Sequence, residues 1–186
     1  MKKSHKLLIV FATLSLILSF NVSCSVIDDF KGGFKRGYES GFKTGESIAK
    51  EIIGEKPVEK TLDSEEVTYV NNLIDHDRRL GNSFVNLNEL FISKNAFTTE
   101  WIIEITAEIE IQNALVEEVR NWNTPERYKK VNKKYLEAMD QLEIANKLIL
   151  EGIYPKDTEK IKRADNHYKM EAELLKEVNK MINEIN

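Results

Sequence analysis

Asp75, His76 and Asp77 are the chain's most concentrated group of possible metal ligands or acid–base residues. Consecutive residues on a helix point to different faces, so these three side chains would not converge on one ion. We expect a structural polar contact instead. Asp77 should lie on or near the core, where Arg78 or Arg79 could neutralise it.

His167 lies four residues before Glu171, a spacing that favours a contact on the helix surface. Di-iron helical bundles carry Glu-x-x-His pairs on two helices. Here Leu73 stands three residues before His76, and Ala164 stands three residues before His167. The sequence lacks that ligand pattern, so we predict no metal site and no cofactor.

Sequence signatures of nucleophilic catalysis and phosphate binding are also missing. The chain has no Gly-x-Ser-x-Gly elbow, no phosphate-binding loop and no His-Glu-x-x-His pair. We therefore assign no catalytic residues and predict that the protein is not an enzyme. Four aromatic residues could line a ligand pocket, but their helical spacing favours a place in the core. They are Trp101, Trp122, Tyr128 and Tyr135.

Composition limits the fold and the partners. The 186 residues carry 27 basic and 31 acidic side chains, for a net charge of -4, and 41% are hydrophobic. This length is typical of one domain, and the three prolines and eight glycines argue against an all-β fold. The single cysteine excludes an internal disulfide. Because the chain is mildly acidic, we predict no nucleic-acid partner.

The first 23 residues have the pattern of an export signal. Three lysines and no acidic residue accompany a 14-residue apolar segment, residues 7–20. That segment is shorter than the roughly 20 residues needed to span a bilayer. The only cysteine, Cys24, follows Val22 and Ser23 directly after this segment.

This arrangement resembles the lipobox of bacterial lipoproteins, although Asn21 stands where an aliphatic residue is usual. The resemblance implies that the Cys24 thiol is diacylated and that the signal is cut before it. The lipid anchor would then hold the protein at the cell membrane, on its extracytoplasmic side. Two alternatives stay open: a secretory signal cleaved after Ser25, and an uncleaved anchor.

Residues 24–62 form a predicted, partly helical tether that carries a four-residue repeat. Its aromatic positions are Phe30, Phe34, Tyr38 and Phe42. Its glycines are Gly33, Gly37, Gly41 and Gly45. On a helix these form two adjacent stripes, and small residues at this spacing let helices approach closely. We predict an interaction role, in self-association or in binding an envelope protein. Contact with lipid headgroups and a flexible spacer are the alternatives.

Residues 63–186 are predicted to form an all-α domain, an antiparallel up-down four-helix bundle. Apolar residues recur there at spacings of three and four. Residues 103–111 also alternate between apolar and polar, but the long stretch without Gly or Pro favours a helix. The expected helices span residues 64–93, 98–122, 125–152, and from a cap at 157 or 158 onward. Short loops make neighbouring helices antiparallel.

Capping residues predict where these helices begin and end. Asp63 and Glu66 have the spacing of a capping box. The Thr124 hydroxyl followed by Pro125 predicts the start of the third helix, and Gly152 predicts its end.

The stretch from Pro125 onward is also similar to helical hairpins of small, uncharacterised lipoproteins of low-GC Gram-positive bacteria. The residues that carry this likeness are Pro125, Tyr128, Tyr135, Leu136, Ala138, Leu148, Ile149, Gly152, Ile153 and Ala164. The resemblance implies a fold and a location, and no biochemical activity.

Together these features predict a non-enzymatic, membrane-anchored lipoprotein that acts as a protein-interaction module at the cell envelope. The alternative is an extracytoplasmic bundle that binds a small ligand, as a sensor or carrier; a third possibility is a structural spacer. A ligand binder should have a cavity lined by Trp101, Trp122 or the tyrosines. An interaction protein should have a filled core and an exposed apolar strip.

Overall fold

The computed structural model describes residues 63–93 and 96–185. Four helices fill most of these ranges: α2 (Ser64–Ile92), α3 (Thr99–Arg120), α4 (Lys129–Ile153) and α5 (Thr158–Ile185). A short 3₁₀ turn, η1 (Glu126–Tyr128), precedes α4. Neither described range contains a β-strand. The all-α prediction is confirmed.

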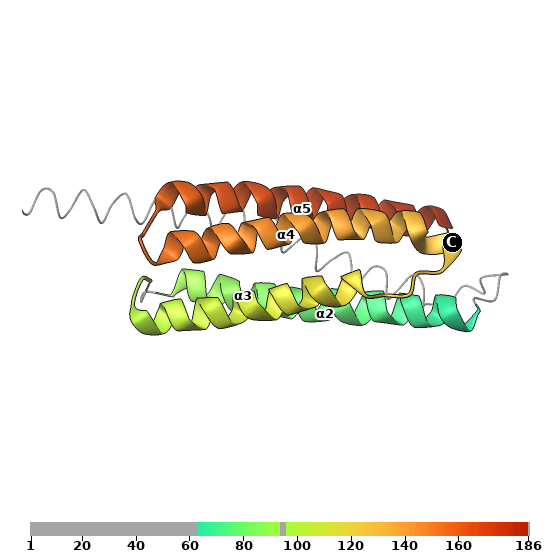
Figure 1. Ribbon diagram of the computed structural model, residues 1–186, viewed down its shortest axis with the longest axis horizontal. Helices are drawn as coiled ribbons and strands as arrows, with labels where there is room; N and C mark the ends of the chain where they lie inside the picture. Colours follow the sequence, from blue (N-terminus) through green and yellow to red (C-terminus); the bar gives the residue numbers. More distant parts are fainter. Residues whose placement is uncertain (1–62, 94–95, 186) are drawn as a thin grey trace, which may run out of the picture.

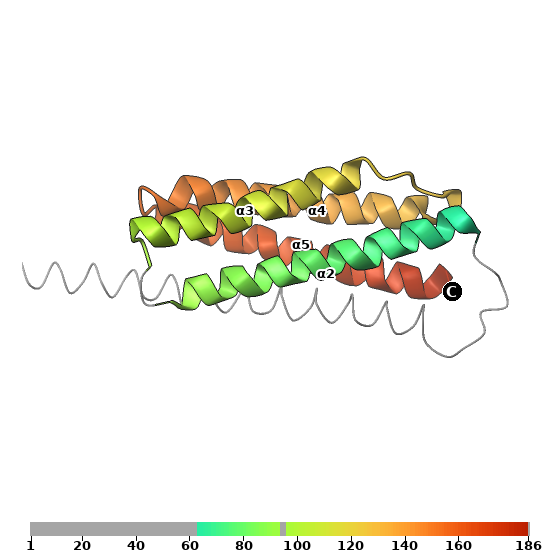
Figure 2. The ribbon, with the colours of Figure 1, turned by 90° about the horizontal axis from the view of Figure 1, so that it is seen from below.

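The four helices run lengthwise in alternating directions. Figure 1 shows the α2–α3 hairpin beside the α4–α5 hairpin, and the turned view in Figure 2 shows α2 next to α5 and α3 next to α4. Each helix therefore packs against two others around a shared axis. This is the expected antiparallel up-down bundle, with α4 and α5 as its most closely packed pair.

Two predicted helix starts are confirmed by their hydrogen bonds. The Asp63 carboxylate accepts from the amides of Glu65 and Glu66 at 2.9 Å each, and Glu66 Oε2 accepts from the Asp63 amide at 3.3 Å. This is the predicted capping box of α2. At α5, Asp157 Oδ1 accepts from the Lys160 amide at 3.1 Å. Both caps satisfy amides that the first turn of a helix leaves without a partner.

The predicted start of the third helix is wrong. No side-chain cap is present at η1 or at α4, and α4 begins at Lys129, four residues after Pro125. A 3₁₀ turn comes first, closed by a hydrogen bond from the Tyr128 amide to the Pro125 carbonyl at 2.9 Å. Such turns are common at helix starts. This one accompanies burial of the Tyr128 ring, whose centroid lies 5.1 Å from that of Tyr69.

Gly152 allows a tight turn between α4 and α5. The Asp157 amide donates to the Gly152 carbonyl at 2.8 Å, and Lys156 adopts a left-handed conformation with φ 57°. A Cβ at position 152 would lie 3.1 Å from Ile161 Cγ1 and 3.2 Å from the Asp157 carbonyl oxygen. The Asp157 backbone and the first turn of α5 approach this closely because no side chain is present at 152. The end of α4 falls one residue after the predicted one, at Ile153.

Side chains from all four helices fill the core. Its largest fully buried members are Tyr69, Leu73, Leu80, Leu87, Ile105, Ile109, Tyr128, Tyr135, Met139, Leu142 and Tyr168. Helix α3 carries two exposed isoleucines, Ile103 and Ile111, whereas α2 and α4 carry one each, Ile92 and Ile144. Of the helices that the structure describes, none has the length and apolarity needed to cross a membrane.

Candidate functional site

The predicted lipid attachment residue, Cys24, and the aromatic–glycine repeat lie outside the described residues. The repeat positions concerned are Phe30, Gly33, Phe34, Gly37, Tyr38, Gly41, Phe42 and Gly45. Their roles stay predictions.

The aromatic residues considered for a ligand pocket are part of the core. Trp101 is buried, donates from Nε1 to the Leu90 carbonyl at 2.8 Å, and packs against Phe91 and Phe97. Trp122 is half-buried at the opposite end of α3 and stacks on Tyr135 with an interplanar angle of 13°. The helical spacing thus predicted their positions correctly.

His76 joins three helices through a buried hydrogen-bonded relay. Its Nε2 lies 2.9 Å from the Leu115 carbonyl of α3, and its Nδ1 lies 2.8 Å from the Tyr135 hydroxyl of α4. A carbonyl only accepts, so Nε2 carries the proton and Nδ1 accepts from the tyrosine. Burial lowers the pKa of His76, which favours this neutral form. The expected structural polar contact is therefore present.

The predicted neutralisation of Asp77 is wrong. Asp77 is buried in the core, as expected, but both candidate arginines bind other carboxylates. Arg78 pairs with Asp75 at 2.5 Å, while Arg79 pairs with Asp75 at 2.9 Å and with Glu118 at 2.5 Å. The arginines follow Asp77 by one and two residues, so the helix turns them away from it. Burial raises the pKa of Asp77 to about 7.

The predicted surface contact between His167 and Glu171 is also wrong. Glu171 is only 1% exposed, and its Oε1 has no hydrogen-bond partner among the described residues. His167 Nδ1 instead lies 2.8 Å from Oε1 of Gln141 on α4. Burial, and then the charge of Asp77, raise the pKa of Glu171 well above its ordinary value. Glu171 occupies a core position of α5 in place of an apolar residue.

Asp77 and Glu171 form a buried carboxyl pair between α2 and α5. Desolvation favours the protonated form of each carboxyl, and the charge of Asp77 adds to this effect at Glu171. Tyr135 and Tyr168 are fully buried, and desolvation raises the pKa of both phenols. Within residues 63–93 and 96–185, no three His, Cys, Asp or Glu side chains are placed to hold a metal ion. The clearest physical effect of these two carboxyls is on stability: as the pH rises and they ionise, the free energy of unfolding falls.

An exposed apolar row follows the outer side of α3. We call Ile103, Ala107, Ile111 and Ala114 the α3 row; Ile103 is 63% exposed, Ile111 is 48% exposed, and both alanines are exposed. Residues at spacings of three and four share one helix face. The same helix buries Ile105 and Ile109, so α3 is apolar on two sides. Its net charge is -5, from one arginine and six glutamates: Glu100, Glu104, Glu108, Glu110, Glu117 and Glu118.

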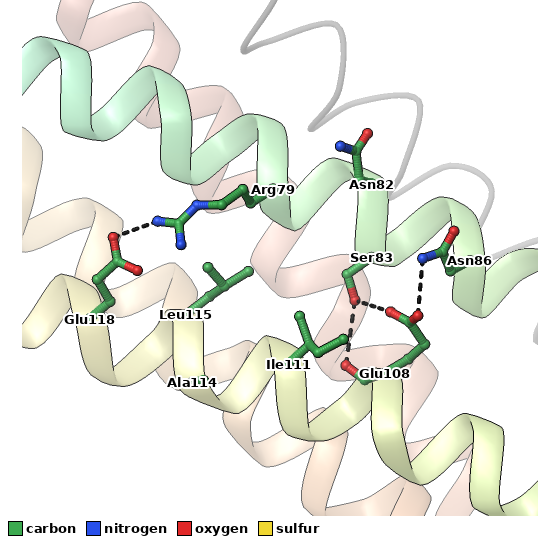
Figure 3. A pocket seen from close by; sticks show the side chains of 9 residues that line it. All are labelled: Arg79, Asn82, Ser83, Asn86, Glu108, Ile111, Ala114, Leu115 and Glu118. Carbon is green, nitrogen blue, oxygen red and sulfur yellow. Dashed lines mark hydrogen bonds and ion pairs between the residues drawn. The ribbon is translucent and has the colours of Figure 1, made fainter.

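A groove of about 380 Å³ lies between α2 and the α3 row. Figure 3 shows its apolar floor, formed by Ile111, Ala114 and Leu115, between two polar ends. At one end Arg79 pairs with Glu118. At the other end, the Glu108 carboxylate accepts from two α2 side chains at 3.0 Å each. These donors are Ser83 and Asn86.

The groove and the row together can receive an apolar side chain flanked by cationic groups. The floor supplies apolar contact, and the exposed carboxylates of Glu104 and Glu110 on the same helix can accept hydrogen bonds from ammonium or guanidinium groups. A second groove, of about 430 Å³, runs along the start of α4. Neither of these grooves is lined by Trp101, Trp122 or a tyrosine.

Sequence reasoning missed both the α3 row and the buried carboxyl pair. The signal for the row was the alternation in residues 103–111, because a period of two on a helix places apolar residues on opposite sides. The signal for Glu171 was its position within the apolar series of the last helix. Gln112 was missed as well; it is fully buried, and no described residue hydrogen-bonds its amide atoms.

Comparisons with protein-family models, curated proteins and solved structures found no match to this chain. The candidate function therefore depends on the chain's own residues.

Proposed function

We propose that this protein is a non-enzymatic lipoprotein, anchored outside the cytoplasmic membrane through Cys24, that binds another protein through the α3 row and its groove. The observation that carries the proposal is the exposed apolar row on an otherwise well-filled bundle. Isoleucines contribute to stability when buried, so two in one exposed row favour a face that a partner covers.

The lipid anchor is tested by metabolic labelling with palmitate and by cell fractionation. We expect label in the membrane fraction of the wild type and none in Cys24→Ser, because acylation requires the thiol. Wild-type protein that takes no label would contradict lipidation. Fractionation would then distinguish a secreted protein from one held by an uncleaved signal.

The interaction face is tested by removing its apolar side chains without disturbing the core. The double variant Ile103→Ser with Ile111→Ser should lose proteins that co-purify with the wild type from chemically crosslinked membranes. Ile144 and Met170 are 40% and 51% exposed on α4 and α5. Their double serine variant is the matched control, and it should retain those proteins. Equal recovery from both double variants would contradict binding through the α3 row.

A further inference from the structure

The charge and the apolar surface of the α3 row and its groove limit the kind of segment that can bind there. Helix α3 has a net charge of -5, and its glutamates flank the exposed isoleucines. A second copy that presented the same face would set these glutamates against each other, which costs binding energy. The same glutamates would repel an anionic lipid surface. The fitting occupant is a cationic segment with apolar side chains.

The chain contains one such segment in its own tether. Residues 30–45, the aromatic–glycine repeat, carry four basic residues and one acidic residue, for a net charge of +3. The basic residues are Lys31, Lys35, Arg36 and Lys43. Each follows an aromatic residue by one or two positions, so apolar and cationic groups occur together along the segment. The glycines permit close approach to another backbone.

The connection between the repeat and the bundle is long enough for the two to meet. Residues 46–62 provide 17 residues between the repeat and Asp63. Fully extended, such a linker spans roughly 56 Å at about 3.3 Å per residue. The groove begins beside Arg79 and reaches Asn86, and its middle lies about 27 Å along α2 from Ser64 at 1.5 Å per residue. A tether of this length gives an effective concentration of about a millimolar.

We propose that the repeat of residues 30–45 docks on the α3 row and the α2–α3 groove of its own chain. An aromatic ring covers Ile111 and Leu115, and neighbouring cationic side chains face the α3 glutamates. The inference rests on the proposed function, because it assumes that the same face binds protein. It identifies the segment that occupies this face when no partner is bound. A partner then binds in competition with the repeat.

The test uses the full-length protein with a photoreactive benzoylphenylalanine in place of Phe34. Irradiation in native membranes, followed by mass spectrometry, identifies the captured peptide. We expect adducts within single chains that map to residues 103–118. The same photoreactive residue at Val58, within the linker, is the control and should give at least fivefold less of this adduct.

Charge exchange distinguishes specific docking from random contact. The variant Lys35→Glu with Arg36→Glu should reduce the intrachain adduct at least fivefold. Adding Glu104→Lys with Glu110→Lys should restore it, because the electrostatic attraction is then re-formed with opposite signs. Both glutamates are exposed, and neither takes part in the ion pairs that α3 forms with the other described residues. If the first variant lost the intrachain adduct and the added lysines did not restore it, docking through these charges would be overturned.

The outcomes separate this inference from the proposed function. Adducts formed only between chains would overturn it, since the occupant would be a second copy. An absent adduct, together with partner loss in the Ile103→Ser, Ile111→Ser variant, would overturn the inference and leave the proposed function standing. An intrachain adduct without any row-dependent partner would support the inference and contradict the proposed function.

Discussion

Replacing Asp77 by asparagine should stabilise the bundle at pH 8 and leave its stability nearly unchanged at pH 4. Burial raises the pKa of Asp77 from 3.8 to about 7. A carboxyl with a raised pKa binds more protons in the folded state, so the free energy of unfolding falls as the pH rises from about 4 to about 7. At pH 8 the ionised carboxylate therefore opposes folding.

The size of the effect follows from the shift in pKa. A change of roughly three units corresponds to about 4 kcal/mol, at about 1.4 kcal/mol per unit. An amide of the same shape cannot ionise, although it is still a buried polar group. We expect Asp77→Asn to raise the free energy of unfolding by about 2 to 4 kcal/mol at pH 8, and to change it by less than about 1 kcal/mol at pH 4.

Urea unfolding followed by circular dichroism, on the chain from Ser25 onward, measures this difference at both pH values. Glu89→Gln is the matched control, because it neutralises an exposed acid on the same helix; its stability should differ from the wild type by no more than about 0.5 kcal/mol. If Asp77→Asn instead lost several kcal/mol at pH 8, the carboxylate would be ionised and held by a favourable partner. The reasoning from desolvation would then be wrong.

Three other substitutions test individual contacts in the same urea assay. Tyr135→Phe removes the donor to His76 Nδ1 and should lower the free energy of unfolding by about 1 to 3 kcal/mol. An unchanged urea midpoint would show that this hydrogen bond contributes nothing to stability. Gly152→Ala should cost about 1 kcal/mol, because crowding against Ile161 exceeds the gain in helix propensity; a more stable variant would contradict that close approach. Asp63→Ala should cost about 1 kcal/mol through loss of the α2 cap, and no loss would show that the capping box is dispensable.

The fold was predictable wherever local residues decide structure. The spacing of Asp63 and Glu66 identified the start of α2, and Gly152 marked the end of α4 to within one residue. Short connections then required antiparallel neighbours. The start of α4 was not predictable from Thr124 and Pro125, because the turn there accompanies burial of the Tyr128 ring against Tyr69, a tertiary contact that local residues do not show.

The candidate site was less predictable, since it depends on which helix faces meet. Periodicity placed Asp77 near the core, but it could not show that Arg79 would reach across to Glu118 on α3. Glu171 sits in the buried series of α5, where packing against α2 decides its environment. The exposure of Ile103 became visible only once the buried side of α3 was known.

In-cell photocrosslinking at Ile111 tests the central claim, that the α3 row binds another protein, most directly. A photoreactive residue at Ile111 should yield a discrete adduct heavier than the single chain, and the same residue at the exposed Met170 of α5 should not. Glu104→Lys with Glu110→Lys should weaken the Ile111 adduct, because the partner surface is expected to be basic. Equal adducts from Ile111 and Met170, or none from either, would contradict the claim.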